Sequence, residues 1–160
     1  MGKEQKLIVT KSNDLIENYI FNATETELQI LNYAVSRLNT LEDNKNVIST
    51  LYIKEIANTY KTKSKNNYEL YKAALFRLMK RDYSYFDLSK NRFVIENLII
   101  RIEQDLSDDS YLVFKFNDYV SQRLSNLKKL FTSYDIKNIA MFKSCYAFML
   151  YDIFKMKFTV

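Results

Sequence analysis

The segment IKEIANTYKTKSKNNYELYKAALFRLMKR, residues 53–81, decides the fold of this chain. Apolar residues recur at helical spacing in residues 53–60 and again in residues 68–80, with the basic stretch KTKSKNN between them. Asn66 or Asn67 can cap the second helix. The expected inward residues are Ile53, Ile56, Ala57, Tyr60, Tyr68, Tyr71, Leu75 and Leu78. Two consecutive helices joined by a short turn predict a helix-turn-helix.

The residues before this segment predict further elements of the same domain. TETELQILNYAVSRL, residues 24–38, begins with a capping box of Thr24 and Glu27 and continues as an amphipathic helix. LIVTKSNDLIENY, residues 7–19, combines a strand-forming run with a helix capped by Ser12 or Asn13. The β-branched VISTLY that follows the loop LEDNKN predicts a short strand. The inward residues of the capped helix are expected to be Leu28, Leu31, Val35 and Leu38.

Beyond the helix-turn-helix, the sequence changes to the period of a strand. Two alternating runs, Leu98–Ile102 and Leu112–Phe116, are separated by the turn Ser107–Ser110 and predict a β-hairpin. A hairpin after two consecutive helices is the order of a winged helix, in which the hairpin forms the wing. We therefore predict an α+β fold, a mainly helical winged helix. Because no proline or Gly/Ser-rich linker interrupts the chain, we expect one domain over residues 1–160.

The C-terminal residues predict helices. DYVSQRLSNL gives a short one, and Thr132 or Ser133 caps a long C-terminal helix from Asp135 to Lys155. Its expected inward residues are Ile136, Ile139, Tyr146, Met149, Leu150 and Ile153. Cys145 falls on this apolar pattern and is interpreted as a core residue rather than a nucleophile.

Missing residue types exclude several classes of function. Histidine is absent, which excludes Ser-His-Asp triads and histidine metal sites, and the only glycine, Gly2, cannot form a phosphate-cradling loop. Asp108 and Asp109 are adjacent and belong to a turn rather than to a catalytic pair. A single cysteine cannot form an internal disulfide, which fits a reducing cytosol. We expect no enzymatic activity, no metal and no cofactor.

Charge is distributed unevenly along a chain whose net charge is +5. Residues 49–92 carry ten basic and four acidic side chains, whereas residues 93–118 carry two basic and six acidic ones. Such a basic segment indicates an anionic partner, with a solvated charged face as the alternative. No apolar run is long enough for a membrane span, and MGKEQK lacks an export signal, so we expect a cytoplasmic protein without membrane contact.

The candidate nucleic-acid contacts lie in the basic turn and on the helix after it. Lysines suit phosphate oxygens, and Asn or Arg side chains can bond base edges in the major groove. The candidates are Lys61, Lys63, Lys65, Asn66, Asn67, Lys72, Arg77, Lys80 and Arg81. Only Asn66, Asn67 and Arg77 suit base reading, so we expect modest sequence specificity. The alternative is helix capping and a solvated basic face.

The predicted wing is acidic and is not expected to enter a DNA groove. Its carboxylates are Glu103, Asp105, Asp108 and Asp109. The second wing strand is interpreted as an edge strand that pairs with its copy in another chain. The candidate dimer interface is Tyr111, Leu112, Val113, Phe114, Lys115 and Phe116. An ordinary hairpin over the core, with a charged solvent face, is the alternative.

Three segments resemble replication initiator (Rep) proteins of iteron-containing, theta-replicating plasmids. LIVTKSNDLIENYIFNATETELQILNYAVSRL is similar to the opening of that family, and VISTLYIKEIANTYKTKSKNNYELYKAALFRLMKR to its helix-turn-helix. LSNLKKLFTSYDIKNIAMFKSCYAFMLYDIF resembles the most specific motif, the ending L..LK..FT.Y.L.NI..LKS.Y..RLYELL. The resemblance covers Leu7–Phe154, the first of two winged-helix domains. Met149 stands where members usually have Arg, and the chain stops at Val160, where they continue into the second domain.

The resemblance implies a function that composition alone does not give. In this family the first domain contributes DNA contacts and mediates dimerisation, while the second supplies much of the base-specific contact with iterons. We accordingly predict a non-catalytic bacterial domain that binds double-stranded plasmid-origin DNA, forms a homodimer and meets host replication proteins. One alternative is a dimerisation or partner-binding winged helix that does not itself contact DNA. The other is a single-domain transcription regulator.

Overall fold

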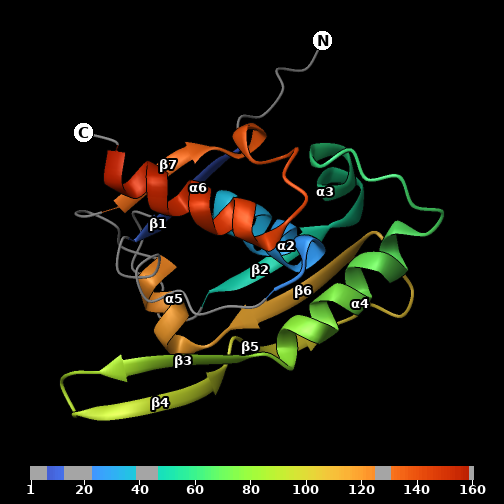
Figure 1. Cartoon of the computed structure of the whole chain (residues 1–160). Coiled ribbons are helices and arrows are strands. Elements are labelled where there is room, and N and C mark those ends of the chain that lie inside the picture. Colours follow the sequence, from blue (N-terminus) through green and yellow to red (C-terminus); the bar gives the residue numbers. More distant parts are fainter. Residues whose placement is uncertain (1–6, 13–22, 39–46, 125–130, 159–160) are drawn as a thin grey trace.

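The computed structural model describes residues 7–12, 23–38, 47–124 and 131–158 and combines helices with antiparallel strands (Figure 1). The strands are β1 (Ile8–Ser12), β2 (Ile48–Tyr52), β3 (Asp82–Asp87), β4 (Arg92–Asn97), β5 (Ile99–Glu103), β6 (Tyr111–Phe116) and β7 (Phe131–Asp135). The helices are α2 (Glu25–Ser36), α3 (Ile53–Thr59), α4 (Asn67–Met79), α5 (Asp118–Leu124) and α6 (Cys145–Phe158), with a short 3-10 helix η1 (Ile136–Asn138). The predicted first helix, its cap Asn13 and the loop LEDNKN lie outside the described residues.

Three helices and a three-stranded sheet form the centre of the molecule. The sheet has the order β2-β6-β5, and both of its strand pairs are antiparallel. Along the chain, α2, β2, α3 and α4 precede β5 and β6, which is the order of a winged helix. The predicted helix-turn-helix corresponds to α3 and α4, and the predicted wing hairpin to β5 and β6. Both are confirmed.

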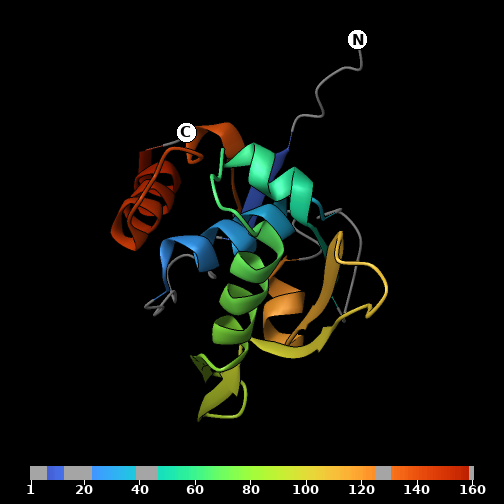
Figure 2. The ribbon, with the colours of Figure 1, turned by 90° about the vertical axis from the view of Figure 1, so that its right-hand side faces the viewer.

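The inward faces of these helices follow from the spacing of their apolar residues. Thr24 Oγ1 accepts a hydrogen bond from the Glu27 N–H, and Glu27 Oε2 accepts one from the Thr24 N–H, both at 3.4 Å, which confirms the capping box. The predicted residues that are buried are Leu28, Leu31, Val35, Ile53, Ile56, Ala57, Tyr60, Tyr71, Leu75 and Leu78. Leu38 and Tyr68 are half-buried against the same core. This packing lays α4 across α2 and beside β5 (Figure 2).

The position of β6 corrects one prediction. The strand Tyr111–Phe116 was expected at the edge of a sheet, but it lies in the middle, with β2 on one side and β5 on the other. Leu112, Phe114 and Phe116 are buried beneath the helices. Its backbone groups are therefore already paired along both sides, and the strand offers no free edge to a second chain.

A second hairpin, β3–β4, is inserted between the helix-turn-helix and the wing and was not predicted. It pairs Asp82–Asp87 with Arg92–Asn97 in antiparallel register. Its turn contains no glycine: Asn91 adopts the left-handed conformation with φ 50°, and Asp87 Oδ1 accepts bonds from the N–H groups of Ser89 and Lys90. The hairpin projects from the lower end of the molecule in both views (Figures 1 and 2).

The long helix predicted from Asp135 to Lys155 is wrong. Phe131–Asp135 is instead strand β7, which pairs with β1, and η1 follows it before the chain reaches α6 at Cys145. Asp135 Oδ1 accepts from the Lys137 N–H and starts the 3-10 turn, while Ser144 Oγ accepts from the Ala147 N–H and starts α6. Two local caps therefore replace one continuous helix.

This break changes which apolar residues face inward. Ile136 and Ile139 are buried as expected, but Tyr146, Leu150 and Ile153 are exposed, and Met149 is half-buried. The buried face of α6 is formed by Phe148 and Asp152, and Tyr134 Oη donates a hydrogen bond to Asp152 Oδ1 at 2.5 Å. The side chain of Cys145 lies outside the described residues. Among the described helices, none has the length and apolarity that a membrane crossing requires.

Candidate nucleic-acid interface

The turn between α3 and α4 begins with a tightly closed helix end. The Lys61 N–H donates to the Asn58 carbonyl at 3.3 Å, and the Thr62 N–H donates to the Ala57 carbonyl at 2.9 Å. These two bonds are those of a Schellman motif, whose C′ residue is left-handed. That residue is Lys61, with φ 52°, where glycine would be preferred. The fold therefore holds a lysine at a position with a conformational cost.

The same turn is attached to the buried side of α4. Thr62 Oγ1 and Tyr71 Oη lie 2.7 Å apart, and Tyr71 is fully buried. Burial raises the pKa of the Tyr71 phenol, although the hydrogen bond with Thr62 lowers it. The phenol consequently stays neutral near pH 7, and either hydroxyl group can be the donor of this hydrogen bond. This bond fixes the path of the chain where it leaves α3.

The N-terminus of α4 is capped by Asn66. Its side chain Oδ1 accepts from the Glu69 N–H at 3.2 Å, and its own N–H donates to Ser64 Oγ at 3.3 Å. Asn67 is half-buried and lines a cavity of about 340 Å³ together with Asp109 and Ser110 of the wing. Of the two residues predicted as possible caps, Asn66 is therefore the one that caps α4. Asn67 instead faces the cavity that α4 shares with the wing.

The predicted lysines occupy different surroundings. Lys63, Lys65 and Lys80 are exposed, at the turn and at the end of α4. Lys72 is half-buried, with its Nζ 5.7 Å from the ring centre of Tyr68 and 5.8 Å from that of Phe76. Cation–π attraction of this kind holds the ammonium group along the helix surface.

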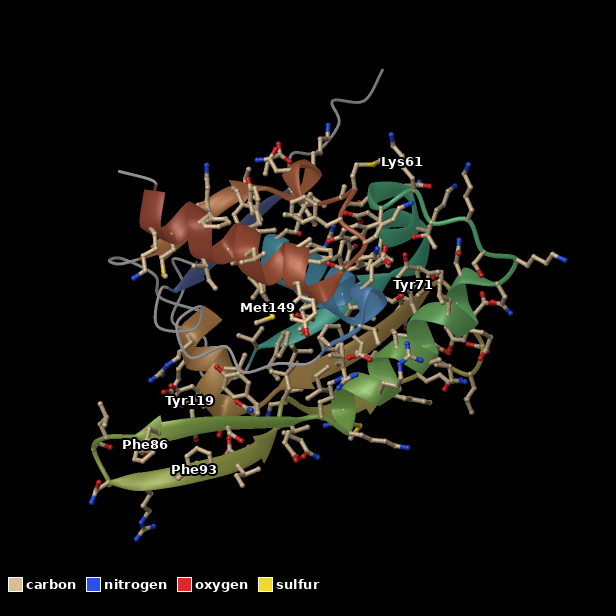
Figure 3. The ribbon with its side chains drawn as sticks, in the orientation of Figure 1. Lys61, Tyr71, Phe86, Phe93, Tyr119 and Met149 are labelled. Carbon is tan, nitrogen blue, oxygen red and sulfur yellow. The ribbon has the colours of Figure 1, made fainter. Side chains whose placement is uncertain are left out.

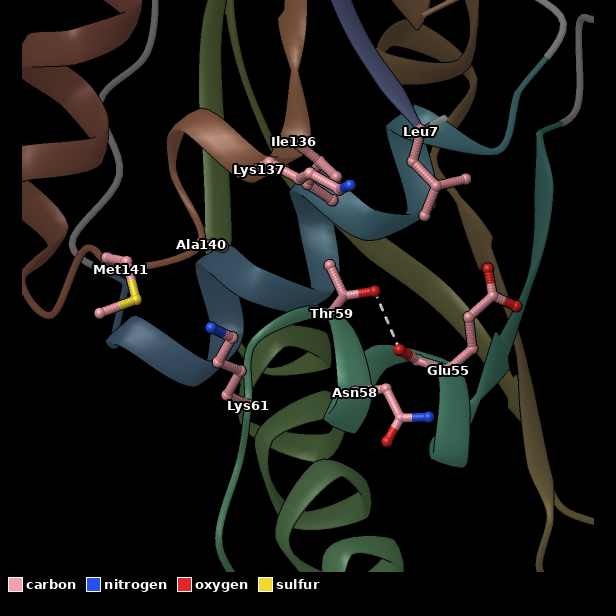
Figure 4. Close-up of a pocket in the computed structure, with 9 residues that line it drawn as sticks. All are labelled: Leu7, Glu55, Asn58, Thr59, Lys61, Ile136, Lys137, Ala140 and Met141. Atoms are coloured by element: carbon pink, nitrogen blue, oxygen red, sulfur yellow. Dashed lines mark hydrogen bonds between the residues drawn. The ribbon is translucent and has the colours of Figure 1, made fainter. Parts of the chain in front are cut away.

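Lys61 lines a larger cavity on the other side of the turn (Figure 4). Its volume is about 630 Å³, and it separates α3 from η1 and the residues before α6. Lys61 reaches it from the turn and Lys137 from η1, and Thr59 Oγ1 donates to the Glu55 carbonyl in its wall at 2.9 Å. The remaining lining residues are Leu7, Asn58, Ile136, Ala140 and Met141.

Arg77 and Arg81, two of the candidates, are engaged within the fold. Arg77 Nε lies 3.1 Å from Glu27 Oε1, and Arg81 forms a two-point ion pair with both oxygens of the same carboxylate. The Glu27 side chain is fully buried at the start of α2, whereas Arg77 keeps 48% of its side chain exposed. Reading a base with Arg77 would compete with this ion pair. The three residues join α2 to α4.

The solvent-facing stripe of α4 differs from the predicted set. Glu69, Ala73, Phe76 and Lys80 recur at spacings of three and four and are exposed. Phe76 is 41% exposed. This stripe is the complement of the buried face of Tyr71, Leu75 and Leu78, and the same helical period could have identified it.

The acidic loop of the wing lies beside the N-terminus of α4. The Ile53 N–H donates to the Ser110 carbonyl at 3.0 Å, and Asp109 lines the same cavity as Asn67 and Tyr68. Asp105 accepts bonds from the Ser107 N–H, the Ser107 hydroxyl and the Tyr111 phenol. These bonds lower the pKa of Asp105, and the bond from the Ser107 N–H has the largest effect. The wing is therefore anionic at pH 7, as its sequence predicted.

This geometry defines the class of protein. The sheet order, the helix-turn-helix and a hairpin in the wing position are those of a winged-helix domain, with one further hairpin after α4. The family model described as initiator replication protein, WH1, matches residues 8–155, and the chain belongs to this family. The resemblance described from the sequence is thereby confirmed.

One solved structure agrees with this assignment at the level of fold. The crystal structure of the Pi initiator protein in complex with iteron DNA matches with a TM-score of 0.80 and 16% identity, over 98% of this chain. The chain spans 66% of the length of that protein. The WH1 domain of MSBI1.176, a replication protein isolated from a multiple sclerosis patient, matches with a TM-score of 0.44 and 14% identity, covering 72% of this chain and 85% of that one. No curated protein sequence matches the chain.

Proposed function

We propose that this domain binds double-stranded DNA of a plasmid origin through its helix-turn-helix, mainly by contacts to the phosphate backbone. The observation that carries the proposal is the placement of exposed Lys63 and Lys65 directly before the N-terminus of α4. Two ammonium groups and the positive end of the helix dipole then act on the same anion. Membership of the initiator family supports iteron DNA as the ligand.

Base contacts are expected from the exposed stripe of α4 rather than from Arg77. Ala73 and Phe76 are apolar and solvent-facing, which suits contact with thymine methyl groups in the major groove. Arg77 and Arg81 are occupied by Glu27, so their charge contributes little to base reading. Sequence discrimination by this domain is therefore modest and directed at thymine-containing steps.

The acidic wing restricts how DNA can approach. Asp109 lies next to the start of α4, where it repels phosphates that pass on the wing side. The duplex is accordingly expected to run past Lys63, Lys65 and Lys80 with its backbone turned away from the wing. The domain acts without catalysis in the bacterial cytoplasm, as expected of a plasmid initiator, and meets its own copy and host replication proteins.

Fluorescence anisotropy tests the proposal with iteron-bearing and scrambled duplexes at two salt concentrations. Each phosphate contact contributes about 0.9 to the slope of log K against log salt, so K63A/K65A should lower the slope by about two for both duplexes. Lys90→Ala, at the exposed turn of the β3–β4 hairpin, serves as the matched control and should leave the slope unchanged. Absence of binding to either duplex at low salt would instead favour a partner-binding module.

A further inference from the structure

Lys61 is held in a costly backbone conformation that no contact of its side chain explains. Its φ is 52°, and glycine would adopt this conformation without steric cost. The side chain is exposed at the α3 end of the turn (Figure 3), and within the described residues it forms no ion pair. Residues in unfavourable conformations cluster at ligand sites. A ligand in the cavity beside Lys61 would account for a lysine at this position.

This cavity, between α3 and η1, is preformed. On one side, the Ile136 N–H donates to the Leu7 carbonyl at 3.0 Å, and on the other the Lys61 N–H donates to the Asn58 carbonyl at 3.3 Å. Each wall is therefore closed by its own hydrogen bonds. The volume of about 630 Å³ lies within the range of about 300–1,000 Å³ that is typical of sites for small ligands.

The apolar part of the cavity is aliphatic. Leu7 and Ile136 are 8% and 2% exposed and form its buried side, together with Ala140. Met141 is 70% exposed, and its flexible thioether can adapt to the shape of a bound molecule. No aromatic side chain occurs among the described lining residues, so an aromatic ring would find no stacking partner there. These walls suit a saturated hydrocarbon chain.

The charged part of the cavity favours an anion. Lys61 and Lys137 line it from two different elements, the turn and η1 (Figure 4). Glu55 is the acidic residue of the described lining, and its carboxylate pairs with Arg37 at 2.5 Å and is turned away from Lys61 (Figure 4). An ammonium group beside an apolar wall attracts a carboxylate more strongly than it would in water.

We infer that this cavity is a binding site for an aliphatic carboxylate. The carboxylate lies at Lys61, with Lys137 as the second cation, and the hydrocarbon chain lies along Leu7, Ile136 and Met141. Such a ligand links the end of α3 to η1. The site is separate from the proposed phosphate contacts of Lys63 and Lys65, which do not line the cavity.

An NMR titration of the ¹⁵N-labelled full chain with octanoate tests the site. Acetate, which shares the carboxylate, and 1-octanol, which shares the chain, are the matched control compounds. The amide signals of Thr59, Lys61, Ala140 and Met141 should shift and saturate with octanoate. Because each control compound lacks one half of the ligand, octanoate should bind about tenfold more tightly than either, or better.

Variants separate the ammonium group from the fold. Lys61→Gly removes the ammonium group and relieves the backbone, so it should weaken octanoate binding about tenfold without lowering the stability of the domain. Lys54→Ala removes an exposed ammonium group from α3 outside this cavity and should leave the affinity unchanged. Ala140→Leu fills part of the aliphatic space and should weaken binding without a change of charge.

Loss of affinity in K61G, with retention in K54A, supports the site. Equal affinity of K61G and the wild type for octanoate would overturn it, as would equal binding of octanoate and 1-octanol. Absence of shifts at millimolar octanoate, or shifts confined to exposed apolar residues of α6 such as Tyr146 and Leu150, would also overturn it. Tighter binding of AMP than of octanoate at the same residues would overturn the aliphatic class of ligand.

Discussion

The hydroxyl groups of Thr62 and Tyr71 lie 2.7 Å apart, and this contact joins the basic turn to the buried face of α4. Thr62 also closes the end of α3 through its N–H. One residue therefore fixes both the conformation of the turn and its distance from α4. The positions of Lys63 and Lys65 in the turn therefore depend on Thr62.

Removal of this contact should destabilise the domain and loosen the turn. Tyr71→Phe deletes only the phenol oxygen, and loss of one hydrogen bond should lower the free energy of unfolding by about 1 kcal/mol. Thr62→Ser keeps the hydroxyl and is the control. Urea unfolding measures the difference, and equal stability of Y71F and the wild type would show that the contact contributes nothing.

At Lys61, whose backbone is left-handed, we expect a substitution to have the opposite effect and to raise the stability of the domain. A non-glycine residue in this conformation costs about 1–2 kcal/mol, whereas glycine loses about 0.5–1 kcal/mol more backbone entropy on folding. Lys61→Gly should therefore stabilise the domain by about 0.5 kcal/mol, measured as a higher urea midpoint at an unchanged m-value. Lys61→Ala removes the same charge without relieving the backbone and should not stabilise.

The carboxylate of Glu27 should contribute strongly to stability. Glu27→Gln keeps the length of the side chain and its ability to cap α2 but removes the charge that Arg77 and Arg81 share. We expect a loss of about 2 kcal/mol in unfolding free energy, as for hydrogen bonds to a charged group. Glu25→Gln removes a carboxylate from the same first turn of α2 at a half-buried position and serves as the control. A change below the error of the measurement would show that the ion pairs are balanced by desolvation.

The wing should respond to acid through Asp105. Bonds from Ser107 and Tyr111 lower its pKa in the folded state below the ordinary value of 3.8. A carboxyl group whose folded pKa is lowered adds stability above the unfolded pKa, and this contribution is lost as pH falls through the folded one. NMR titration should place its midpoint below 3.8, and Ser107→Ala should move it upward. An identical midpoint in the variant would assign the shift to the backbone bond and the Tyr111 phenol, without the Ser107 hydroxyl.

The methyl group of thymine can distinguish base contact by α4 from phosphate contact, because only a base contact depends on it. If Phe76 covers a thymine methyl, replacing thymine by uracil in the duplex removes about 0.8 kcal/mol, which is about fourfold in Kd. Phe76→Ala should lose affinity for the thymine duplex and no longer distinguish it from the uracil duplex. Equal affinities of the wild type for both duplexes would exclude the contact.

Residue spacings within single elements predicted much of this fold. They could not predict contacts between residues that are far apart in the sequence. The capping box of α2, the buried faces of α3 and α4, and the wing hairpin all follow from spacings within one element. The Arg77–Glu27 pair joins residues from separate helices, and no periodicity indicates it. The unexpected β3–β4 turn and the break before α6 lack the glycine or proline that usually marks such points, because Asn91 and Ser144 perform those roles here.

The arrangement of Glu27, Arg77 and Arg81 also limits how this sequence can diverge. If Arg81 were replaced first, the fully buried carboxylate of Glu27 would keep only one of its two arginine partners. If Glu27 were replaced first, two cations would face the start of α2 without a carboxylate between them. Either single step costs stability that the other would recover. These three positions are therefore expected to change together or not at all, which makes them an epistatic unit in the history of the domain.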